Sequence, residues 1–343
     1  MNPPVNPAAG PAVTKSTGRD PAVPVAEVED LHVEFRLRRG PLGGWVPLRA
    51  VRAVDLAVGE RETVGLVGES GSGKSTTGRA LLRLVEPTRG RIRLEGEDIT
   101  GLRGEALRAV RRRMQMVFQD PYSSLDPAMV IAESIGEPLD THLELTREQR
   151  TARIAELLEH VGLSRRHLDR YPYEFSGGQR QRIAIARAIA VHPRLVVCDE
   201  PVSALDVSTQ NQILNLLEDI QAEYDISYLF IAHDLAVVRH IAHRVAVMYL
   251  GEIVETGPTD RLFDKPAHPY TEALLSAVPL PSPRRQRERT RIVLSGEVPD
   301  AADPPPGCAF HTRCPYVMDR CRTEEPAATP VAGGGIVRCH LRG

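Results

Sequence analysis

Five segments have the alternating or continuous apolar pattern of strands: 31–36, 51–58, 62–67, 91–94 and 114–118. In the first of them, Leu31, Val33 and Phe35 alternate with polar neighbours, as in a strand with one buried face. The third segment runs directly into a glycine-rich loop, and a helical pattern over residues 74–85 follows it. In the first third of the chain, the apolar pattern therefore predicts mainly strands, with one helix directly after the loop.

From about residue 129 to residue 190 the pattern becomes helical. Ile154, Leu157, Leu158 and Val161 have the i, i+3, i+4, i+7 spacing that buries one face of a helix. Strand-like runs then return at 195–198, 228–231 and 245–250. Because strands alternate with helices, we predict an α/β fold with a largely parallel sheet and a helical insertion between its halves.

The two ends of the chain differ from this pattern. Residues 1–24 are rich in Pro, Ala and Gly without apolar periodicity, and we expect a disordered tail there. Residues 279–285, rich in Pro and Arg, are interpreted as a linker to a C-terminal extension. No run of 18 apolar residues occurs, and prolines interrupt the N-terminus, so we expect neither a membrane span nor a signal peptide. The chain is therefore expected to stay in the cytosol.

Composition and charge narrow the class of protein. The 343 residues carry 43 basic and 45 acidic side chains, and this balance argues against a nucleic-acid-binding surface. The hydrophobic fraction of 42% and the charged fraction of 26% are typical of a globular protein and exclude a fibrous repeat. Only three lysines are present: Lys15, Lys74 and Lys265.

The glycine-rich loop matches G-x-x-x-x-G-K-[ST], the pattern of a nucleotide-binding phosphate loop. It reads Gly68-Glu69-Ser70-Gly71-Ser72-Gly73-Lys74-Ser75, followed by Thr76. Glycines allow backbone N–H groups to surround phosphates, and the next helix adds its positive N-terminal end. Lys74 can reach the β- and γ-phosphates, and the Ser75 hydroxyl can bind Mg²⁺. A chance glycine turn is disfavoured because the loop lies between a predicted strand and a predicted helix.

Two carboxylates follow the predicted strand at 195–198. Asp199 can hold Mg²⁺ through water, and Glu200 can polarise the attacking water as a general base. A strand that ends in an acid is common at protein surfaces, so this interpretation depends on the phosphate loop upstream.

A second candidate anion site precedes a predicted helix and reads Ser176-Gly177-Gly178-Gln179. Alone, it would be interpreted as an ordinary serine cap followed by glycines. One nucleotide hardly needs two anion-binding turns from one chain. A dimer explains both if each chain gives its phosphate loop to one nucleotide and its Ser-Gly-Gly turn to the other.

The ordered set of these motifs with Gln119, Ser203-Ala204-Leu205-Asp206 and His233 resembles the ATP-binding-cassette ATPases. The resemblance covers about residues 26–265. It implies a P-loop NTPase core with a mostly parallel sheet and an antiparallel β subdomain. The implied ATPase domain spans 25–265 with a helical subdomain at about 120–190, and a small Cys-rich extension spans 266–343.

The same resemblance implies roles for single residues. Gln119 would link the Mg²⁺ site, which also includes Ser75 and Asp199, to the transport partner. Ser176, Gly177 and Gly178, with Gln179 after them, would cap the γ-phosphate of the ATP bound by the other chain. Asp206 would communicate across the dimer, and His233 would contact the γ-phosphate; alone, this histidine would be interpreted as a surface or core residue.

The family also stacks an aromatic ring on adenine from a strand that precedes the phosphate loop. Phe35 matches that strand, but residues 36–48 look like an insertion, and Trp45 within it is the alternative. Either ring could instead pack against the protein.

Three further segments resemble the ATPases of di- and oligopeptide importers: 117–127, 268–279 and 307–315. This likeness implies a peripheral subunit at the cytoplasmic face of the inner membrane that hydrolyses ATP to power peptide import. Its partners would be two transmembrane permease subunits, a second ATPase and, through the complex, an extracytoplasmic peptide-binding protein. Residues 75–82 and 36–48 look more like the second of two paired ATPases, which favours a heterodimer. Nickel and some antibiotic-peptide importers share this ATPase type, so the cargo stays open.

Two classes without a transport role share a composite ATP site. A DNA-repair or chromosome-structure ATPase would need a long coiled coil or a zinc insertion, but only about 100 residues separate Lys74 from Ser176. A translation-type cassette protein carries two ATPase cores in one chain, and this chain has one set of motifs. Both classes are disfavoured.

Four of the five cysteines lie in the last 36 residues: Cys308, Cys314, Cys321 and Cys339. Disulfides are disfavoured in the cytosol, and the spacing matches neither the short pairs of zinc modules nor the ferredoxin run. Three interpretations stay open: a [4Fe–4S] cluster, which the resemblance favours; Zn²⁺, with His311 or His340 replacing a thiolate; and metal-free packing. Cys198, inside a predicted buried strand, is interpreted as packing.

Overall fold

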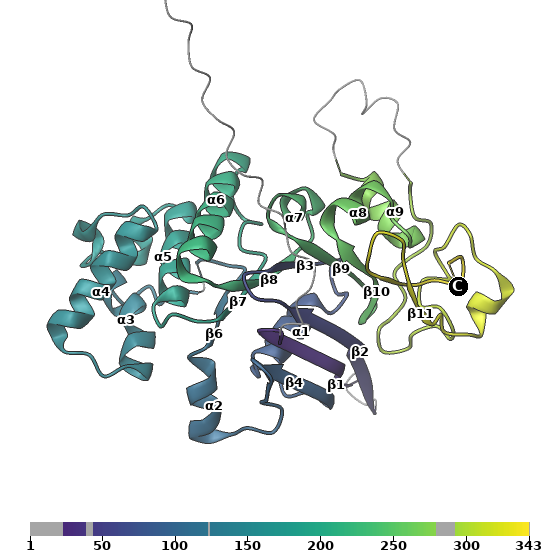
Figure 1. Ribbon diagram of the computed structural model, residues 1–343, viewed down its shortest axis with the longest axis horizontal. Helices are drawn as coiled ribbons and strands as arrows, with labels where there is room; N and C mark the ends of the chain where they lie inside the picture. Colours follow the sequence, from purple (N-terminus) through teal and green to yellow (C-terminus); the bar gives the residue numbers. More distant parts are fainter. Residues whose placement is uncertain (1–22, 39–43, 123, 279–291, 343) are drawn as a thin grey trace, which may run out of the picture.

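The computed structural model describes residues 23–38, 44–122, 124–278 and 292–342. These residues form two β-sheets, and helix α1 (Lys74–Leu81) contacts strands of both (Figure 1). The predicted linker and residues 1–22 of the predicted tail lie outside the described residues.

The smaller sheet is antiparallel and has the order β2-β1-β4-β5. Its strands are β1 (Ala26–Arg38), β2 (Trp45–Val58), β4 (Arg89–Leu94) and β5 (Glu97–Asp98). Phe35 pairs with Leu48 and Arg38 pairs with Trp45, so the ends of the stretch interpreted as an insertion extend the β1–β2 hairpin.

The larger sheet is mixed and has the order β11-β12-β10-β9-β3-β8-β7-β6. Its parallel strands are β3 (Thr63–Val67), β6 (Met114–Val117), β7 (Leu195–Asp199), β8 (Ser227–Ala232) and β9 (Arg244–Tyr249), with β6 at the edge. Every residue of β3, β7 and β8 is buried, as expected for parallel strands covered on both faces. The predicted strands of the core are therefore confirmed, and β10 (Glu252–Pro258) continues the sheet antiparallel to β9.

The predicted helical insertion is present at one end of the molecule, in teal in Figure 1. It contains α3 (Ile131–His142), α4 (Arg147–His160), η1 (Arg165–His167), η2 (Pro172–Glu174) and α5 (Gly177–Ile189). Ile154, Leu157, Leu158 and Val161 are fully buried, which confirms the face predicted from their spacing. The other helices are α2 (Gly104–Arg111), α6 (Val207–Tyr224), α7 (Leu235–Ile241), α8 (Thr259–Asp264) and α9 (Pro269–Ser276).

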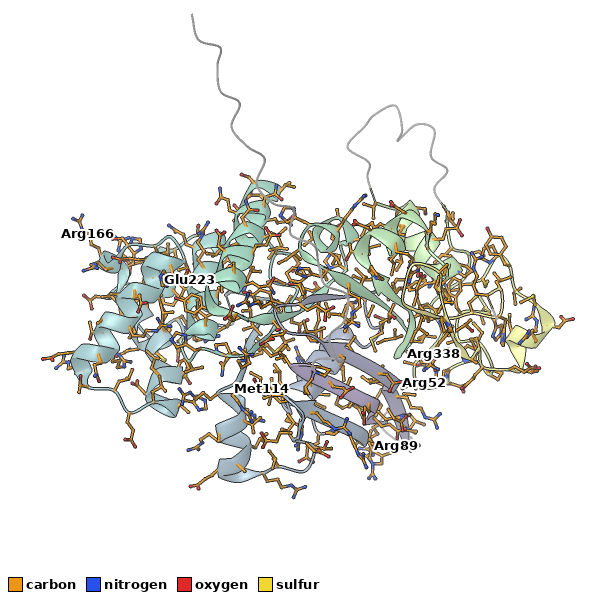
Figure 2. The ribbon with its side chains drawn as sticks, viewed as in Figure 1. Arg52, Arg89, Met114, Arg166, Glu223 and Arg338 are labelled. Atoms are coloured by element: carbon orange, nitrogen blue, oxygen red, sulfur yellow. The ribbon has the colours of Figure 1, made fainter. Side chains whose placement is uncertain are left out.

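The C-terminal segment, in yellow in Figure 1, packs at the opposite end from the helical insertion. It contains η3 (Asp319–Arg322), β11 (Ala328–Pro330) and β12 (Ile336–Arg338), and β12 pairs with β10. Figure 2 labels Arg52 where this segment meets the small sheet. Arg52 Nη2 lies 2.8 Å from Glu252 Oε1 and 3.8 Å from Glu325 Oε1, so one side chain of β2 binds both β10 and the extension.

Among the helices that the structure describes, none is long and apolar enough to cross a membrane.

An aromatic cluster joins the extension to the core. The ring centroids of Tyr249, on β9, and Tyr270, on α9, are 4.7 Å apart, and Phe310 of the extension lies 5.2 Å from the first and 5.4 Å from the second. All three rings are fully buried. His268 packs 5.5 Å from Phe310, and its Nδ1 accepts the backbone N–H of Tyr270 at 3.0 Å.

The His268 ring makes stability depend on pH. Burial lowers its pKa from 6.5 to about 3, so the folded protein keeps the ring neutral while the unfolded chain protonates it below about pH 6.5. This contribution to stability is fully present above pH 6.5 and is lost as the pH falls. We expect it to lower the free energy of unfolding by about 2 kcal/mol between pH 7 and pH 5.

The measurement is denaturant unfolding of wild type and His268→Asn at both pH values. Asparagine keeps an acceptor for the Tyr270 N–H but does not titrate. The pH-dependent loss should be smaller in the variant by the amount given above, and an equal loss in both proteins would contradict the assignment.

Candidate nucleotide site

The phosphate loop connects β3 to α1 and passes so close to neighbouring strands that two of its positions have no room for a side chain. At Gly73 the backbone is left-handed, with φ 104°, and a Cβ there would lie 2.3 Å from the Ala50 carbonyl oxygen of β2. A Cβ on Gly68 would lie 2.1 Å from the Met248 carbonyl oxygen of β9. The loop is therefore held between two strands at positions that accept only glycine.

Lys74 is buried at the start of α1 and is already satisfied by the loop. Its Nζ donates hydrogen bonds to the carbonyl oxygens of Gly68 and Glu69, both at 2.8 Å. Burial lowers the pKa of Lys74, and the nearby carboxylates of Glu200, Asp199 and Glu69 oppose that shift. The ammonium group is thus held inside the loop, in a site where an anion would be strongly attracted.

Ser75 and Asp199 form the second polar centre. The Ser75 hydroxyl donates to Asp199 Oδ1 at 2.7 Å, which joins the start of α1 to the end of β7. Burial raises the pKa of Asp199, while the Ser75 hydrogen bond and Arg79 oppose the shift. A hydroxyl next to a buried carboxylate is a donor set that suits Mg²⁺.

Glu200 has two polar partners and an unusual backbone. Gln119 Nε2 donates to its Oε2 at 2.9 Å, and His233 Nδ1 lies 3.1 Å from the same atom. Its φ is 47°, a left-handed conformation that costs energy for a residue with a side chain. The backbone N–H of Glu200 is bound at 2.9 Å to the Ile231 carbonyl oxygen of β8, which helps to hold that conformation.

These residues surround one cavity of about 590 Å³, lined by Phe35, Leu48, Ala50, Ser70, Gly71, Gly73, Lys74, Ser75, Thr76, Gln119, Glu200, His233 and Ala301. The structure thus brings together most of the residues predicted around the phosphate loop. Phe35 is among them, whereas Trp45 is 67% exposed and is not part of this lining in the described chain.

The Ser-Gly-Gly turn lies elsewhere. Ser176 caps α5, and its hydroxyl accepts the Gln179 N–H in a capping box. Asp206 caps α6 by accepting the Thr209 N–H at 3.0 Å, and a Cβ on Gly178 would lie 2.5 Å from Thr209 Cγ2. Within the described part of the chain, the turn and Asp206 therefore lie close to each other but do not line the Lys74 cavity.

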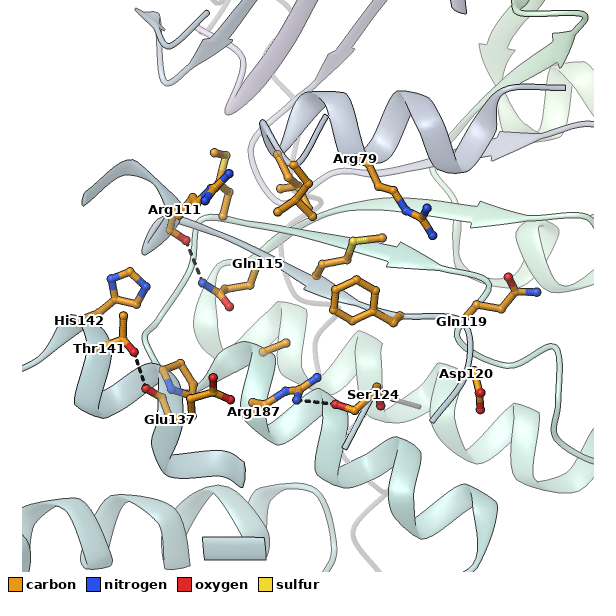
Figure 3. A pocket seen from close by; sticks show the side chains of 17 residues that line it. Arg79, Arg111, Gln115, Gln119, Asp120, Ser124, Glu137, Thr141, His142 and Arg187 are labelled. Atoms are coloured by element: carbon orange, nitrogen blue, oxygen red, sulfur yellow. Dashed lines mark hydrogen bonds between the residues drawn. The ribbon is translucent and has the colours of Figure 1, made fainter. Parts of the chain in front are cut away.

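A larger groove of about 700 Å³ lies beside this cavity (Figure 3). Figure 3 shows Arg79, Gln119, Arg187 and His142 around it, on α1, after β6, on α5 and on α3. Gln119 lines both the groove and the cavity, and its amide binds Glu200. The Gln119 side chain therefore borders both the groove and the nucleotide cavity.

All five cysteines are free. Cys308, Cys314, Cys321 and Cys339 lie close enough for neighbouring thiols to add to the shift that burial causes, which raises the pKa of Cys308 to about 11. No three His, Cys, Asp or Glu side chains among the described residues are grouped closely enough to hold a metal ion. The donors have the chemistry of a thiolate site, but the expected metal centre is not confirmed. Cys198 is fully buried in β7, as predicted.

The structure adds contacts that no motif predicted. Glu69 of the phosphate loop binds Arg313 and Tyr270 from the C-terminal third of the chain, and Ala301 lines the cavity. Arg313 is 244 positions from Glu69. No local spacing could have linked the two residues.

Comparisons with known proteins agree with this geometry. Residues 51–203 match the family model "ABC transporter", and residues 254–321 match "Oligopeptide/dipeptide transporter, C-terminal region". The probable peptide ABC transporter ATP-binding protein y4tS of Sinorhizobium fredii is 55% identical, over 92% of this chain and 89% of its own length. The oligopeptide transport ATP-binding protein AppF of Bacillus subtilis is 49% identical, over 92% and 97%.

Among solved structures, the chain is similar to the dimeric post-hydrolysis state of the ATP-binding cassette MJ0796 bound to ADP and phosphate. The TM-score is 0.61 with 29% sequence identity, and the similarity covers 68% of this chain and 98% of that one. The fold of the core is thus that of an ATP-binding cassette.

Proposed function

The chain belongs to the ABC transporter family, among the ATP-binding subunits of oligopeptide importers, and we propose how its residues carry out that work. The subunit binds ATP and hydrolyses it to drive transport. The proposed chemistry rests on one observation: Gln119 and His233 both contact Glu200 in the cavity that Lys74 also lines.

In the proposed site, the phosphate loop binds the nucleotide. Lys74 exchanges its bonds to the loop carbonyls for bonds to the β- and γ-phosphates, and backbone N–H groups of residues 71–76 donate to the same oxygens. Ser75 and Asp199 would hold Mg²⁺, which when bound neutralises charge on the phosphates. Phe35 stays the predicted platform for adenine, since its ring lines the cavity.

Glu200 is the proposed general base. Its carboxylate accepts from Gln119 and lies beside His233, so two side chains orient the atom that would take a proton from the attacking water. His233, 57% exposed at the rim, is the proposed contact to the γ-phosphate.

We propose that a second ATPase chain completes the site. The Ser176 turn and Asp206 lie outside the Lys74 cavity, so one chain holds two half-sites that a head-to-tail dimer would join into two whole ones. The likeness to the second ATPase of paired systems favours a heterodimer over a homodimer.

Glu200→Gln should lower ATP turnover by roughly 100-fold or more, because the amide cannot accept the proton of the attacking water. Binding should persist, since the amide leaves Lys74 and the loop unchanged. We expect the variant to accumulate as an ATP-bound dimer, measured by phosphate release and by size exclusion with ATP. Gln119→Glu is the matched comparison: this variant keeps Glu200 as the general base but places a second carboxylate, which repels it, where the Gln119 amide donated a hydrogen bond. Wild-type turnover in Glu200→Gln would refute the assignment of the base.

The groove beside Gln119 is the proposed docking site of a permease segment. A segment seated there would touch Gln119, whose amide binds Glu200, so movement of the segment and the state of the hydrolysis site would be mechanically linked. This docking would hold the subunit at the cytoplasmic face of the membrane.

Thr141→Trp tests the docking site. Thr141 is exposed on α3 and lines the groove, and the indole should fill it without touching the ATP cavity. We expect the variant to lose co-purification with the two permease subunits while the isolated subunit still binds ATP. Thr151→Trp is the control. Thr151 is exposed on α4, and its hydroxyl, like that of Thr141, donates to the carbonyl oxygen four residues earlier in its own helix. Equal recovery of permeases with both variants would exclude docking at this groove.

For the four late cysteines, we propose a [4Fe–4S] cluster in the extension, with Zn²⁺ as the alternative. The support is chemical: four free thiols, three of which add to the raised pKa of Cys308, are the ligands that such a centre uses, although no three ligand side chains among the described residues are grouped closely enough to hold a metal ion. Such a centre would be structural and would stabilise the extension.

Protein purified without oxygen should contain iron and inorganic sulfide and absorb near about 400 nm if the cluster is present. Cys308→Ser should lose that iron and unfold at a lower temperature. Cys198→Ala, outside the extension, should keep it. Stoichiometric zinc without iron would favour the alternative, and protein free of both metals would refute a metal site.

A further inference from the structure

The second residue of the phosphate loop is bound by the C-terminal extension. Arg313 Nη1 donates to Glu69 Oε2 at 2.7 Å, and Nη2 donates to Oε1 at 3.1 Å. The pair is bidentate, the geometry in which guanidinium and carboxylate groups bind most strongly. The Arg313 side chain is only 7% exposed, so solvent screens this contact little.

A second bond from the same region holds the backbone of Glu69. Its N–H donates to the Tyr270 hydroxyl at 2.9 Å, and its carbonyl oxygen accepts from Lys74 Nζ at 2.8 Å. The Gly68 carbonyl oxygen, which belongs to the same peptide group as the Glu69 N–H, also accepts from Lys74 Nζ at 2.8 Å. The peptide group between Gly68 and Glu69 is therefore held by Tyr270 of α9 on one side and by Lys74 on the other, and the Glu69 side chain is held by the extension. A shift of Glu69 would move a bond that Lys74 makes.

Arg313 lies in a segment that packs against the core. The backbone N–H of Arg313 donates to the Phe310 carbonyl oxygen at 3.0 Å, and the Phe310 ring packs against Tyr249 and Tyr270 in the buried aromatic cluster. Ala301, also in the extension, lines the nucleotide cavity. The extension thus contacts the phosphate loop through Arg313 and the nucleotide cavity through Ala301.

The charge of Glu69 is a second reason why the contact with Arg313 matters for nucleotide binding. Without Arg313, the carboxylate of Glu69 would be a free negative charge in the loop that receives the phosphates, and it would repel them. Glu69 also supplies part of the negative charge around Lys74.

We propose that Arg313 is a positioning residue for the phosphate loop, so that the ATP affinity of this subunit depends on how the C-terminal extension is docked. The inference rests on the proposed nucleotide site but assigns a function to a segment outside the ATPase core. Through this contact, a change in the extension alters nucleotide binding without touching the nucleotide.

The test is nucleotide affinity of the full-length chain, measured by titration with a fluorescent ATP analogue and competition with ATP. We expect Arg313→Met to weaken binding by roughly ten-fold, because the freed carboxylate repels the phosphates and the loop loses one anchor. In the assembled transporter the KM for ATP should rise while kcat changes little. Arg320→Met is the control, since Arg320 lies in the same extension in an exposed pair with Glu324 at 3.9 Å.

The double variant Glu69→Gln/Arg313→Met separates positioning from simple loss of structure. Removal of the unpaired charge should restore part of the lost affinity, whereas damage to the extension alone would leave the double variant as weak as the single one. Arg313→Lys, which keeps the charge but not the fork, should bind with intermediate affinity and provides the measurement if the methionine variant does not fold.

Wild-type affinity in folded Arg313→Met, or equal weakness of the single and double variants, would overturn the inference. The proposed nucleotide site fails separately, if the wild-type chain binds no ATP or if Lys74→Ala binds it as well as wild type.

Discussion

The parallel register of β6, β7, β8 and β3 is the constraint on which the site depends. Val117 pairs with Cys198, Asp199 with Ile231, and Val67 with Ala232, so these strands end at nearly the same level. The residues that follow each strand must therefore leave the sheet at one edge. Gln119, Glu200, His233 and the phosphate loop meet there although more than a hundred positions separate the first strand from the last.

Burial at that edge sets the electrostatics of the site. Lys74 and Asp199 are both nearly inaccessible to solvent. Burial lowers the pKa of Lys74 and raises the pKa of Asp199, so that in each case it favours the neutral form. Their neighbours oppose both shifts: carboxylates surround the lysine, while a hydroxyl and Arg79 act on the aspartate. The loop carbonyls already hold the ammonium group in place. An arriving phosphate thus meets a charge that is preorganised and weakly solvated, which is the condition under which electrostatic binding is strongest.

Prediction from the sequence was correct for the strands and helices that carry the short motifs. The phosphate loop, the Asp199–Glu200 pair and the cap at Ser176 each lie within a few positions, and the structure has the expected strand or helix at each of them. It failed where a contact depends on tertiary packing. For this reason the sequence did not predict the Glu69–Arg313 pair. It also did not predict that β1 and β2 pair as far as Arg38 and Trp45, because that depends on cross-strand pairing. The late cysteines show the same limit, since their spacing is compatible with three arrangements and only side-chain positions distinguish them.

The placement of contacts around the loop also bears on how signals reach the nucleotide. The cavity is approached from the groove through Gln119, which binds Glu200, and from the extension through Arg313, which binds Glu69. These two routes end on different functions, because Glu200 is the proposed base and Glu69 carries a carbonyl that holds Lys74. The helical insertion and the extension lie at opposite ends of the molecule (Figure 1). In the proposed scheme, docking at the groove would act on hydrolysis through Gln119 and Glu200, while the extension would act on nucleotide affinity through Arg313 and Glu69.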